Sequence, residues 1–570
     1  MVNATRNLAL SAKIVSLNLR RGEWVAQLPL SSRPFLNHHL TQPTHPFLLF
    51  SILVSVIMSE ADKFTSMKPE DPEFYAELLS KIPRTTNRRQ SSDGQSCPNV
   101  PGIQRLDFAL SRRLQTLLDA IADISLCQRG NVAATMAGVK DNTGTLETQL
   151  YIVFNHQNDE SALACTQHLQ NIINMLRRVP FAPSTTDGSP KVIPRELESN
   201  QIEICQAIHD YSFEVFQYRV TKREHKLLEI RRYIEQDQTN YFSDQERRTL
   251  LEFLHNVDRI IAVTTTTTTD QFPTVFIKAL LGLYSSWTHN DILPKDPLAD
   301  NKLTLLDRAD TWLAKSAWSD AYMILLWPES IFFYLDHVIG FQLRRWALKI
   351  MSFVIATNRL FILSQSHRLR GIIDGNISVK VLGSLTTTPY RCHLSSETIQ
   401  TALKDSATET GSVPYNWDNN CEWFITEVLR NGEEPIDVDH STPTVHAELA
   451  MIMAMVKGEI EDILPYIGVS KLSCTMCSHY IDAFNQVCKQ NIVTKGSHGK
   501  AYPGWSWPSF PDHDNELRLT FLGRVRRQLL NDLVLYAGRR LSDSSVGSGG
   551  PEMEKIPTSE VDEWFAELGL

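Results

Sequence analysis

His446, Glu448, Cys474 and Cys477 combine side chains that hold a metal ion with one that can move a proton. One imidazole nitrogen and two thiolate sulfurs form a ligand set that suits zinc, and three protein ligands leave the fourth tetrahedral position open to water. Zinc bound in this way lowers the pKa of water to about 7, so that hydroxide is available at neutral pH. We therefore expect a catalytic Zn2+ site formed by His446, Cys474 and Cys477, with Glu448 beside the metal rather than on it.

Local sequence signals predict that both halves of this group lie at helix N-termini. Thr442 and Pro443 are typical of an N-cap and a first helical position, which puts the histidine and the glutamate in the first turns of a helix. Ser473 is a second N-cap candidate and predicts a helix over residues 474–487, with both cysteines on one face of its first turn. The positive end of the helix dipole there favours thiolates. Residues 466–470 predict a short buried strand between the two helices.

The order of these motifs matches a known arrangement for removal of an amino group from a base. That arrangement is His-x-Glu followed by Pro-Cys-x-x-Cys, with the glutamate as general acid and base. The chain departs from it at one position, because Ser473 stands where the proline is expected. The departure affects the approach of the second helix and not the ligands. We expect Glu448 to be the catalytic residue, taking a proton from zinc-bound water and passing it to departing ammonia.

Three ordered segments carry a family resemblance: VHAE at 445–448, YIGVSKLSCTMC at 466–477 and GSHGKAYPGW at 496–505. They resemble a large, mostly uncharacterised fungal family of the cytidine-deaminase-like superfamily, grouped with predicted nucleic-acid deaminases. The resemblance implies an α/β fold, in which a cytidine-deaminase-like sheet is flanked by helices and zinc lies between the two helix starts. It also implies that zinc hydroxide attacks an amino-bearing ring carbon of a nucleobase, carried by a nucleotide or by a nucleic acid.

Two further residues are candidates for contact with the substrate. His498 lies in the glycine-rich part of the third segment, and Trp505 ends that segment. Aromatic faces stack on bases without reading their sequence, so Trp505 and its neighbours Tyr502 and Trp507 are suited to hold a base. Packing of these rings over the domain, and simple solvation of His498, are the alternatives.

A closed structural zinc site is the main alternative to a catalytic one. It needs a fourth ligand, and the nearby candidates are His440, His479, Cys488 and His498. Such a site gives no reason for an acid at position 448. A catalytically silent deaminase-like module, whose zinc holds the fold while other regions bind a protein partner, is a second interpretation of the whole chain. A metal-dependent hydrolase of another amide or amidine is a third.

The 570-residue chain is long for one core, and its composition changes along its length. Residues 1–102 predict an N-terminal extension and linker, largely disordered. Residues 103–440 predict a large, mainly α-helical additional region, whose β-hairpin near 131–154 would supply the first two strands of the family's sheet. Residues 441–540 hold the deaminase-like zinc domain. Residues 541–570 predict a flexible linker and an acidic tail; this tail and the helical region are the candidates for binding a protein partner.

Bulk composition argues against several classes of protein. Hydrophobic residues make up 42% of the chain and charged residues 21%, which is typical of soluble globular proteins. The 9 cysteines are too sparse for a disulfide scaffold, which favours an intracellular location, cytoplasmic or nuclear. The net charge of -9 argues against coating of nucleic acid by general phosphate neutralisation, but it is compatible with a local basic groove.

The N-terminal region contains an apolar run over residues 47–58 that is shorter than the roughly 20 residues needed to cross a bilayer. We therefore expect no membrane association. Met58 is followed by a polar stretch that suits a protein start, so we expect residues 1–57 to be an upstream extension. A buried apolar segment and a secretion signal are the alternatives.

Overall fold

The computed structural model describes residues 64–82, 90–91, 108–142, 145–156, 159–180, 195–236, 244, 247, 251, 254, 339–341, 343–385, 387–411, 417–429, 435–510 and 513–544. The chain divides into two compact units, Met1–Lys63 and Phe64–Leu570, and all described residues belong to the second. The expected upstream extension 1–57 and residues 545–570 of the expected linker and acidic tail lie outside the described residues, whereas residues 541–544 of that expected linker belong to a helix. Within the described ranges, no helix is both long enough and apolar enough to cross a membrane.

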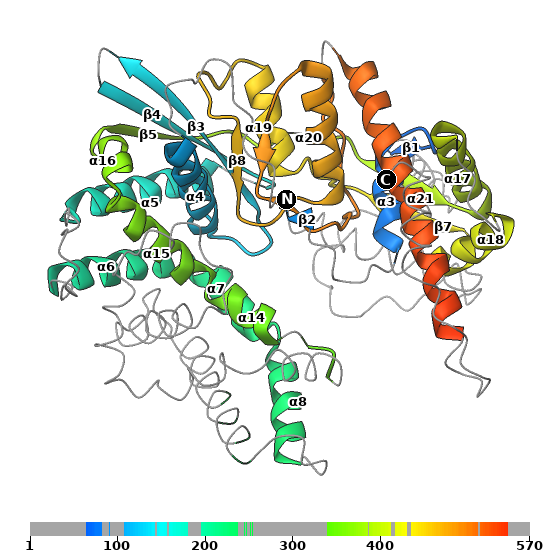
Figure 1. The fold of residues 1–570 in the computed structure, drawn as a ribbon, viewed down its shortest axis with the longest axis horizontal. Coiled ribbons are helices and arrows are strands. Elements are labelled where there is room, and N and C mark those ends of the chain that lie inside the picture. Colours follow the sequence, from blue (N-terminus) through cyan, green and yellow to red (C-terminus); the bar gives the residue numbers. More distant parts are fainter. Residues whose placement is uncertain are drawn as a thin grey trace, which may run out of the picture. The chain divides into compact units, whose positions relative to one another are not determined.

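A five-stranded mixed sheet has the strand order β5-β4-β3-β8-β9 (Figure 1). Its strands are β3 (Ala133–Asn142), β4 (Thr145–Phe154), β5 (Asn376–Val381), β8 (Tyr466–Val469) and β9 (Val493–Thr494). β3 runs antiparallel to β4 and to β8, while β5 is parallel to β4 and β9 is parallel to β8. The β3–β4 hairpin and the strand between the two site helices therefore belong to one sheet.

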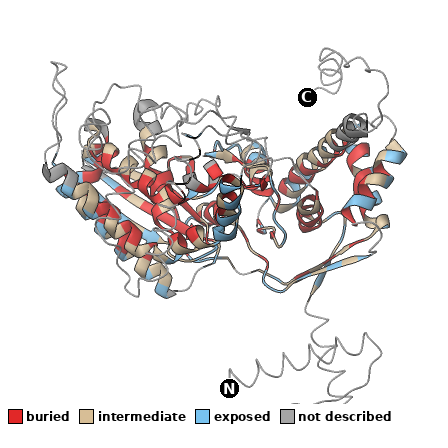
Figure 2. Cartoon of the chain, turned by 90° about the horizontal axis from the view of Figure 1, so that it is seen from below, coloured by how far each residue is buried: buried red, intermediate tan, exposed pale blue. Residues whose placement is uncertain are grey.

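Alternate residues of β3 face two separate hydrophobic cores, as the two-residue period of a strand requires. Ala133 and Ala137 lie in the first core, and Ala134 and Met136 lie in the second. Both faces of the sheet are buried in this way, and Figure 2 shows buried residues along the sheet and on the helices beside it. The mixed α/β class predicted from the sequence is confirmed.

Helices from both sides of the β3–β4 hairpin in the sequence surround the first core. This core includes α4 (Phe108–Ile124), α5 (Asp159–Arg178), α6 (Arg195–Tyr211), α7 (Phe213–Thr221), α8 (Glu224–Glu235), α14 (Leu343–Ile350), α15 (Ser352–Ser364) and α16 (His367–Asp374). α4 packs on β8 and β3 through Leu114, Leu117, Leu118 and Ile121, whose spacing of one, three and four residues places them on one helical face.

The two helices that begin at the candidate site lie in the second core. α19 (Ala447–Val456) packs against β3 and β4 on one side and against α20 (Thr475–Cys488) on another. The residues Ala447–Ala454 are all buried, which explains why this helix is apolar on every face. The same core includes α17 (Ser396–Thr410), α18 (Trp417–Val428) and α21 (Asp514–Ser544).

A second sheet has the order β1-β6-β7, and its strands are β1 (Thr65–Met67), β6 (Tyr390–Leu394) and β7 (Ile436–His440). Beside it lies α3 (Pro72–Lys81), which is buried from Pro72 to Leu79. A two-stranded sheet pairs β2 (Gln90–Ser91) with β10 (Gly496–Ser497). Residues 64–82 fall in the predicted, largely disordered extension, but they form a strand and a helix, because Phe74, Tyr75 and Leu78 enter the second core.

Candidate metal centre

His446 is the N-cap of α19, and an extended segment precedes it. Its backbone is extended (φ −66°, ψ 152°), and the helix begins at the next residue. Upstream, the amide of Thr444 donates to the carbonyl of Gly504 at 2.8 Å, and the carbonyl of Thr444 accepts from the amide of Ser506 at 3.0 Å. The predicted helix start at Thr442 is therefore wrong, because this segment pairs with the loop instead of turning into the helix.

The two cysteines occupy the start of α20 in a similar way. Cys474 is the N-cap, and its Sγ accepts a hydrogen bond from the amide of Cys477 at 3.3 Å. The helix therefore begins one residue later than the sequence indicated, with the cysteine as its cap in place of Ser473. A thiolate can take this role because it accepts the free amides of a first helical turn, as a serine oxygen does.

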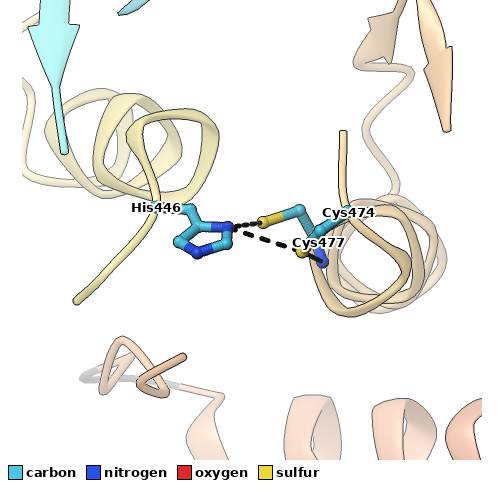
Figure 3. A group of neighbouring side chains, drawn as sticks. All are labelled: His446, Cys474 and Cys477. Carbon is cyan, nitrogen blue, oxygen red and sulfur yellow. Dashed lines mark hydrogen bonds between the residues drawn. The ribbon is translucent and has the colours of Figure 1, made fainter. Parts of the chain in front are cut away.

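The three side chains converge on one point between the two helix starts (Figure 3). The Nδ1 atom of His446 lies 3.4 Å from the Sγ of Cys474 and 3.3 Å from the Sγ of Cys477. A nitrogen and a sulfur that bind one tetrahedral zinc ion at ordinary bond lengths lie about 3.5 Å apart. All three ligand atoms are within 4.8 Å of one another. The group could therefore hold a metal ion, and its spacing fits zinc.

No fourth His, Cys, Asp or Glu joins this group in the part of the chain that the structure describes. His440 instead places its Nε2 atom 3.0 Å from the carboxylate of Glu77. The other candidates for a fourth ligand, His479, Cys488 and His498, also lie outside the group. Three protein ligands leave one tetrahedral position for water or substrate, which is typical of catalytic rather than structural zinc.

The charges of the three metal-binding side chains depend on one another. Burial by itself would raise the pKa of Cys474, but a hydrogen bond from Cys477 and the positive charge of His446 hold that pKa well below its ordinary value. Burial would lower the pKa of His446, but the neighbouring Cys474 raises it. The pKa of Cys477 is raised well above its usual range by burial and by Cys474. The pocket thus stabilises a thiolate at Cys474, which is the form that binds metal.

Glu448 lies on the first turn of α19 with 3% of its surface exposed, and it is not part of the metal-binding group. Burial raises the pKa of its carboxyl group, while the charge of His446 and a hydrogen bond from Ser473 oppose that shift. A carboxyl group whose pKa moves toward neutrality can both accept and release a proton. Ser473, which replaces the expected proline, thus has a contact of its own with this carboxylate.

Asn155 is a residue of the site that sequence reasoning missed. It directly follows β4, and its Oδ1 atom accepts the amide of Ala447 at 2.7 Å. This bond caps the first turn of α19 from another element, because His446 makes no side-chain cap of its own. The only sequence signal was a polar residue at the end of a predicted strand. The β3–β4 hairpin therefore helps to hold the start of the helix that carries the histidine.

The two tentative substrate residues have different surroundings. His498 is half-buried, and its ring lies 5.4 Å from that of Tyr502, which is 43% exposed and lies 6.1 Å from the ring of His446. Trp505 is 0% exposed and stacks on Phe521 at 5.7 Å, so its face is not open to a base. Of the two alternatives given for Trp505, packing over the domain is the one that its surroundings favour, because the ring lies in the second core. Tyr502 is the aromatic ring beside the site that remains accessible.

Trp505 instead lies behind the metal-binding group. It approaches Cys477 closely enough to lower the pKa of that thiol, against the larger effect of burial. The loop that carries it is held by α3, since Glu73 accepts the amide of Trp507 at 2.8 Å. His440, bonded to Glu77, packs against Gly504, where an added Cβ would come within 3.2 Å of its ring. No local pattern in the sequence predicts these contacts of α3, because they join residues far apart in the chain.

Comparison with known proteins is informative for one segment of the chain. A family model described as an OTT_1508-like deaminase matches residues 445–509. No curated protein and no solved structure matches the chain. The matched segment starts beside His446 and includes Cys474 and Cys477. Residues 445–509 are thus similar to a deaminase family, and the group that could hold a metal ion lies within them.

Proposed function

We propose that the chain is a zinc-dependent hydrolytic deaminase that acts on an amino-bearing nucleobase, carried by a nucleotide or a nucleic acid. The observation that carries this proposal is the arrangement of three ligand atoms at zinc spacing beside a buried glutamate that is not a ligand. The similarity of residues 445–509 to a deaminase family supports a hydrolase acting on C–N bonds. A structural zinc site would have no need of an acid at Glu448.

Bound zinc would supply Lewis acidity that makes a water molecule nucleophilic at neutral pH. Glu448 would accept one proton from the attacking water and deliver it to the amino group as the C–N bond breaks. Hydroxide adds to the amino-bearing ring carbon, and the amino group takes the proton from Glu448 and leaves as ammonia. The remaining hydroxyl proton moves to the ring nitrogen as that carbon becomes a carbonyl. The raised pKa of Glu448 supports this role, because the same carboxyl group must hold the proton between the two steps.

The surroundings of His446 support an aromatic substrate. Tyr502 is exposed and its ring lies next to that of His446. The ring of His498 lies edge-on to the ring of Tyr502. An exposed ring at this position could stack on a base, an interaction worth about 1–3 kcal/mol. On this proposal Tyr502 takes the part that the sequence analysis gave to Trp505, and His498 stays a candidate for contact with the substrate.

The decisive experiment measures ammonia release from a panel of cytosine-, adenine- and guanine-containing compounds by wild type and Glu448→Gln. The variant is nearly isosteric and leaves the three metal-binding side chains unchanged. We expect it to retain zinc and to lose at least about a hundredfold in rate, the lower range for general acid–base catalysis. Undiminished turnover in this variant would refute the role of Glu448. Zinc binding without ammonia release from any compound would favour the silent module instead.

A further inference from the structure

Four cationic side chains gather where the helical region meets the loop before α20. They are Arg129 after α4, Lys222 at the end of α7, Lys349 in the last turn of α14 and Lys471 in the loop itself. All four are exposed, and together they are called the cation cluster below. They come from four segments that are distant in sequence, so only the tertiary structure creates the group.

Specific contacts hold the cation cluster in place. Arg129 lies 3.8 Å and Lys222 lies 5.0 Å from the ring centre of Tyr218. The half-buried Arg219 joins α7 to α14 by donating to the backbone carbonyl of Lys349 at 3.2 Å. The contacts with Tyr218 orient Arg129 and Lys222 without neutralising their charge. These two members of the cluster are therefore positioned by the fold and remain positive.

Lys471 connects the cluster to the metal centre. Its Nζ atom donates to the carbonyl of Asn131 at 3.4 Å, and it lies three positions before Cys474. The side chain is exposed, yet enough protein surrounds it that desolvation lowers its pKa, and the charges of Arg219, Lys349 and Lys222 lower it further. Lys471 thus joins the cluster to the loop that leads directly into Cys474.

The cation cluster differs from two arginines of α21, which are paired with carboxylates. On α21, Arg526 contacts Glu409 at 2.9 Å and Arg524 contacts Asp482 at 3.5 Å. Among the described residues, by contrast, no carboxylate lies within ion-pair distance of Arg129, Lys222 or Lys471, and nearby Lys495 is paired with Asp119. Mutual repulsion of cations costs free energy, and a bound anion would remove that cost.

We propose that the cation cluster binds a phosphate group of the substrate whose base enters the metal centre. The assignment of this phosphate to a substrate rests on the proposed function. Lysine and arginine side chains are the usual partners of phosphate oxygens in nucleotides and nucleic acids. A local cluster also explains how a chain with a net charge of -9 can attract an anion to one place. A free nucleotide and a polynucleotide carry the same phosphate chemistry.

The test is a binding measurement on the full chain in the Glu448→Gln background, so that it depends on no turnover. The probes are a short fluorescent single-stranded oligonucleotide, and cytidine and adenosine with and without a 5′-phosphate. Lys222→Gln and Lys471→Gln are combined, and Lys404→Gln, an exposed lysine of α17, is the matched control for loss of charge. We expect the double variant to bind the phosphate-bearing probe about tenfold more weakly, with the slope of log affinity against log salt reduced by about 0.7 per lysine.

The outcomes separate the two proposals and the two sources of phosphate. Loss of nucleotide affinity with unchanged nucleoside affinity identifies a free nucleotide, whereas loss confined to the oligonucleotide identifies a polynucleotide. Either loss without ammonia release by wild type would keep the phosphate site and reject the deaminase. Equal binding by the double variant and Lys404→Gln, or no binding of any phosphate-bearing probe by the parent protein, would overturn the cation cluster as a phosphate site.

Discussion

Two of the side chains that could hold a metal ion, His446 and Cys474, lie at helix N-caps, where free backbone amides and the helix dipole favour negative charge. The sulfur of Cys474 makes two contacts at this position: it accepts a hydrogen bond from the amide of Cys477, and it faces the ring of His446. Cys477 lies one turn further along α20 and completes the group. Removal of any one ligand leaves two, which is too few for a tight zinc site.

We expect Cys477→Ala to lose most of its zinc, because neither His446 nor Cys474 has a replacement ligand within the described group. Cys488→Ala is the matched control, since Cys488 ends the same helix and lies outside the group. The measurement is zinc per chain by elemental analysis after gel filtration, with circular dichroism to verify folding. A full complement of zinc in folded Cys477→Ala would contradict the assigned ligands.

At the scale of elements, β8 positions the site because the two helices attached to it carry the ligands. Its backbone lies directly against α4, and an added Cβ on Gly468 would come within 2.5 Å of the backbone carbon of Leu118 and 2.7 Å of Thr135 Oγ1. The Oγ1 atom of Thr135 donates to the Leu118 carbonyl at 2.8 Å in the same contact. This close approach of helix and strand leaves no room for a methyl group.

We expect Gly468→Ala to lower the free energy of unfolding by about 2–3 kcal/mol, because α4 or β3 must move away from β8. Gly371→Ala is the control: Gly371 lies in α16, and an added Cβ there meets nothing within 4 Å. The control should be neutral or stabilising by up to about 1 kcal/mol, since alanine favours helix. Midpoints of urea unfolding measure both. Equal midpoints for Gly468→Ala and wild type would show that α4 does not rest on this strand.

At the scale of the whole molecule, the first core buries titratable groups whose pKa values make stability depend on pH. His168 on α5 is 9% exposed and stacks on Tyr211 of α6, with ring centres 3.9 Å apart. Burial lowers the pKa of His168 to about 3. Because the unfolded chain binds this proton below about pH 6.5 and the folded chain does not, the contribution of His168 to stability falls as the pH falls from about 6.5 to 3. Burial of Asp123, whose pKa is raised to about 6, acts in the opposite direction.

Acidification from pH 7 to pH 5 should cost wild type about 2 kcal/mol through His168 alone, at about 1.4 kcal/mol for each pH unit below 6.5. We expect His168→Phe to remove that part of the pH dependence, because phenylalanine keeps the stacked ring and cannot be protonated. Comparing the variant with wild type cancels the effect of Asp123. Urea unfolding at pH 7 and pH 5 measures the difference, and the same substitution at exposed His225 is the control. An unchanged pH dependence in His168→Phe would show that His168 is protonated in the folded protein.

Local patterns in the sequence were sufficient to find the three side chains that could hold a metal ion, because ligand type and short spacing determine which side chains can share an ion. His446, Cys474 and Cys477 do come together, and the short strand between their helices is β8. The helix starts were displaced by one residue at Ser473 and by several at Thr442. At the first place Ser473 is used in another contact, with Thr494, and at the second the chain after Thr442 pairs with the loop at Gly504. Only the folded chain specifies these contacts.

The tertiary structure decided which distant segments support that site. Thr135 on β3 pairs with Gly468 on β8, and Asn155 caps α19, yet these partners are separated by 333 and 292 residues respectively. It also placed α3 behind the loop of Trp505 and buried that ring. No local pattern specifies such contacts, because they depend on which backbone hydrogen-bonding groups and apolar side chains the remote segments present. The sequence by itself therefore determined which side chains could hold a metal ion and move a proton. The packing of remote segments decided how exposed these side chains are, which charges surround them and which residues hold them in place.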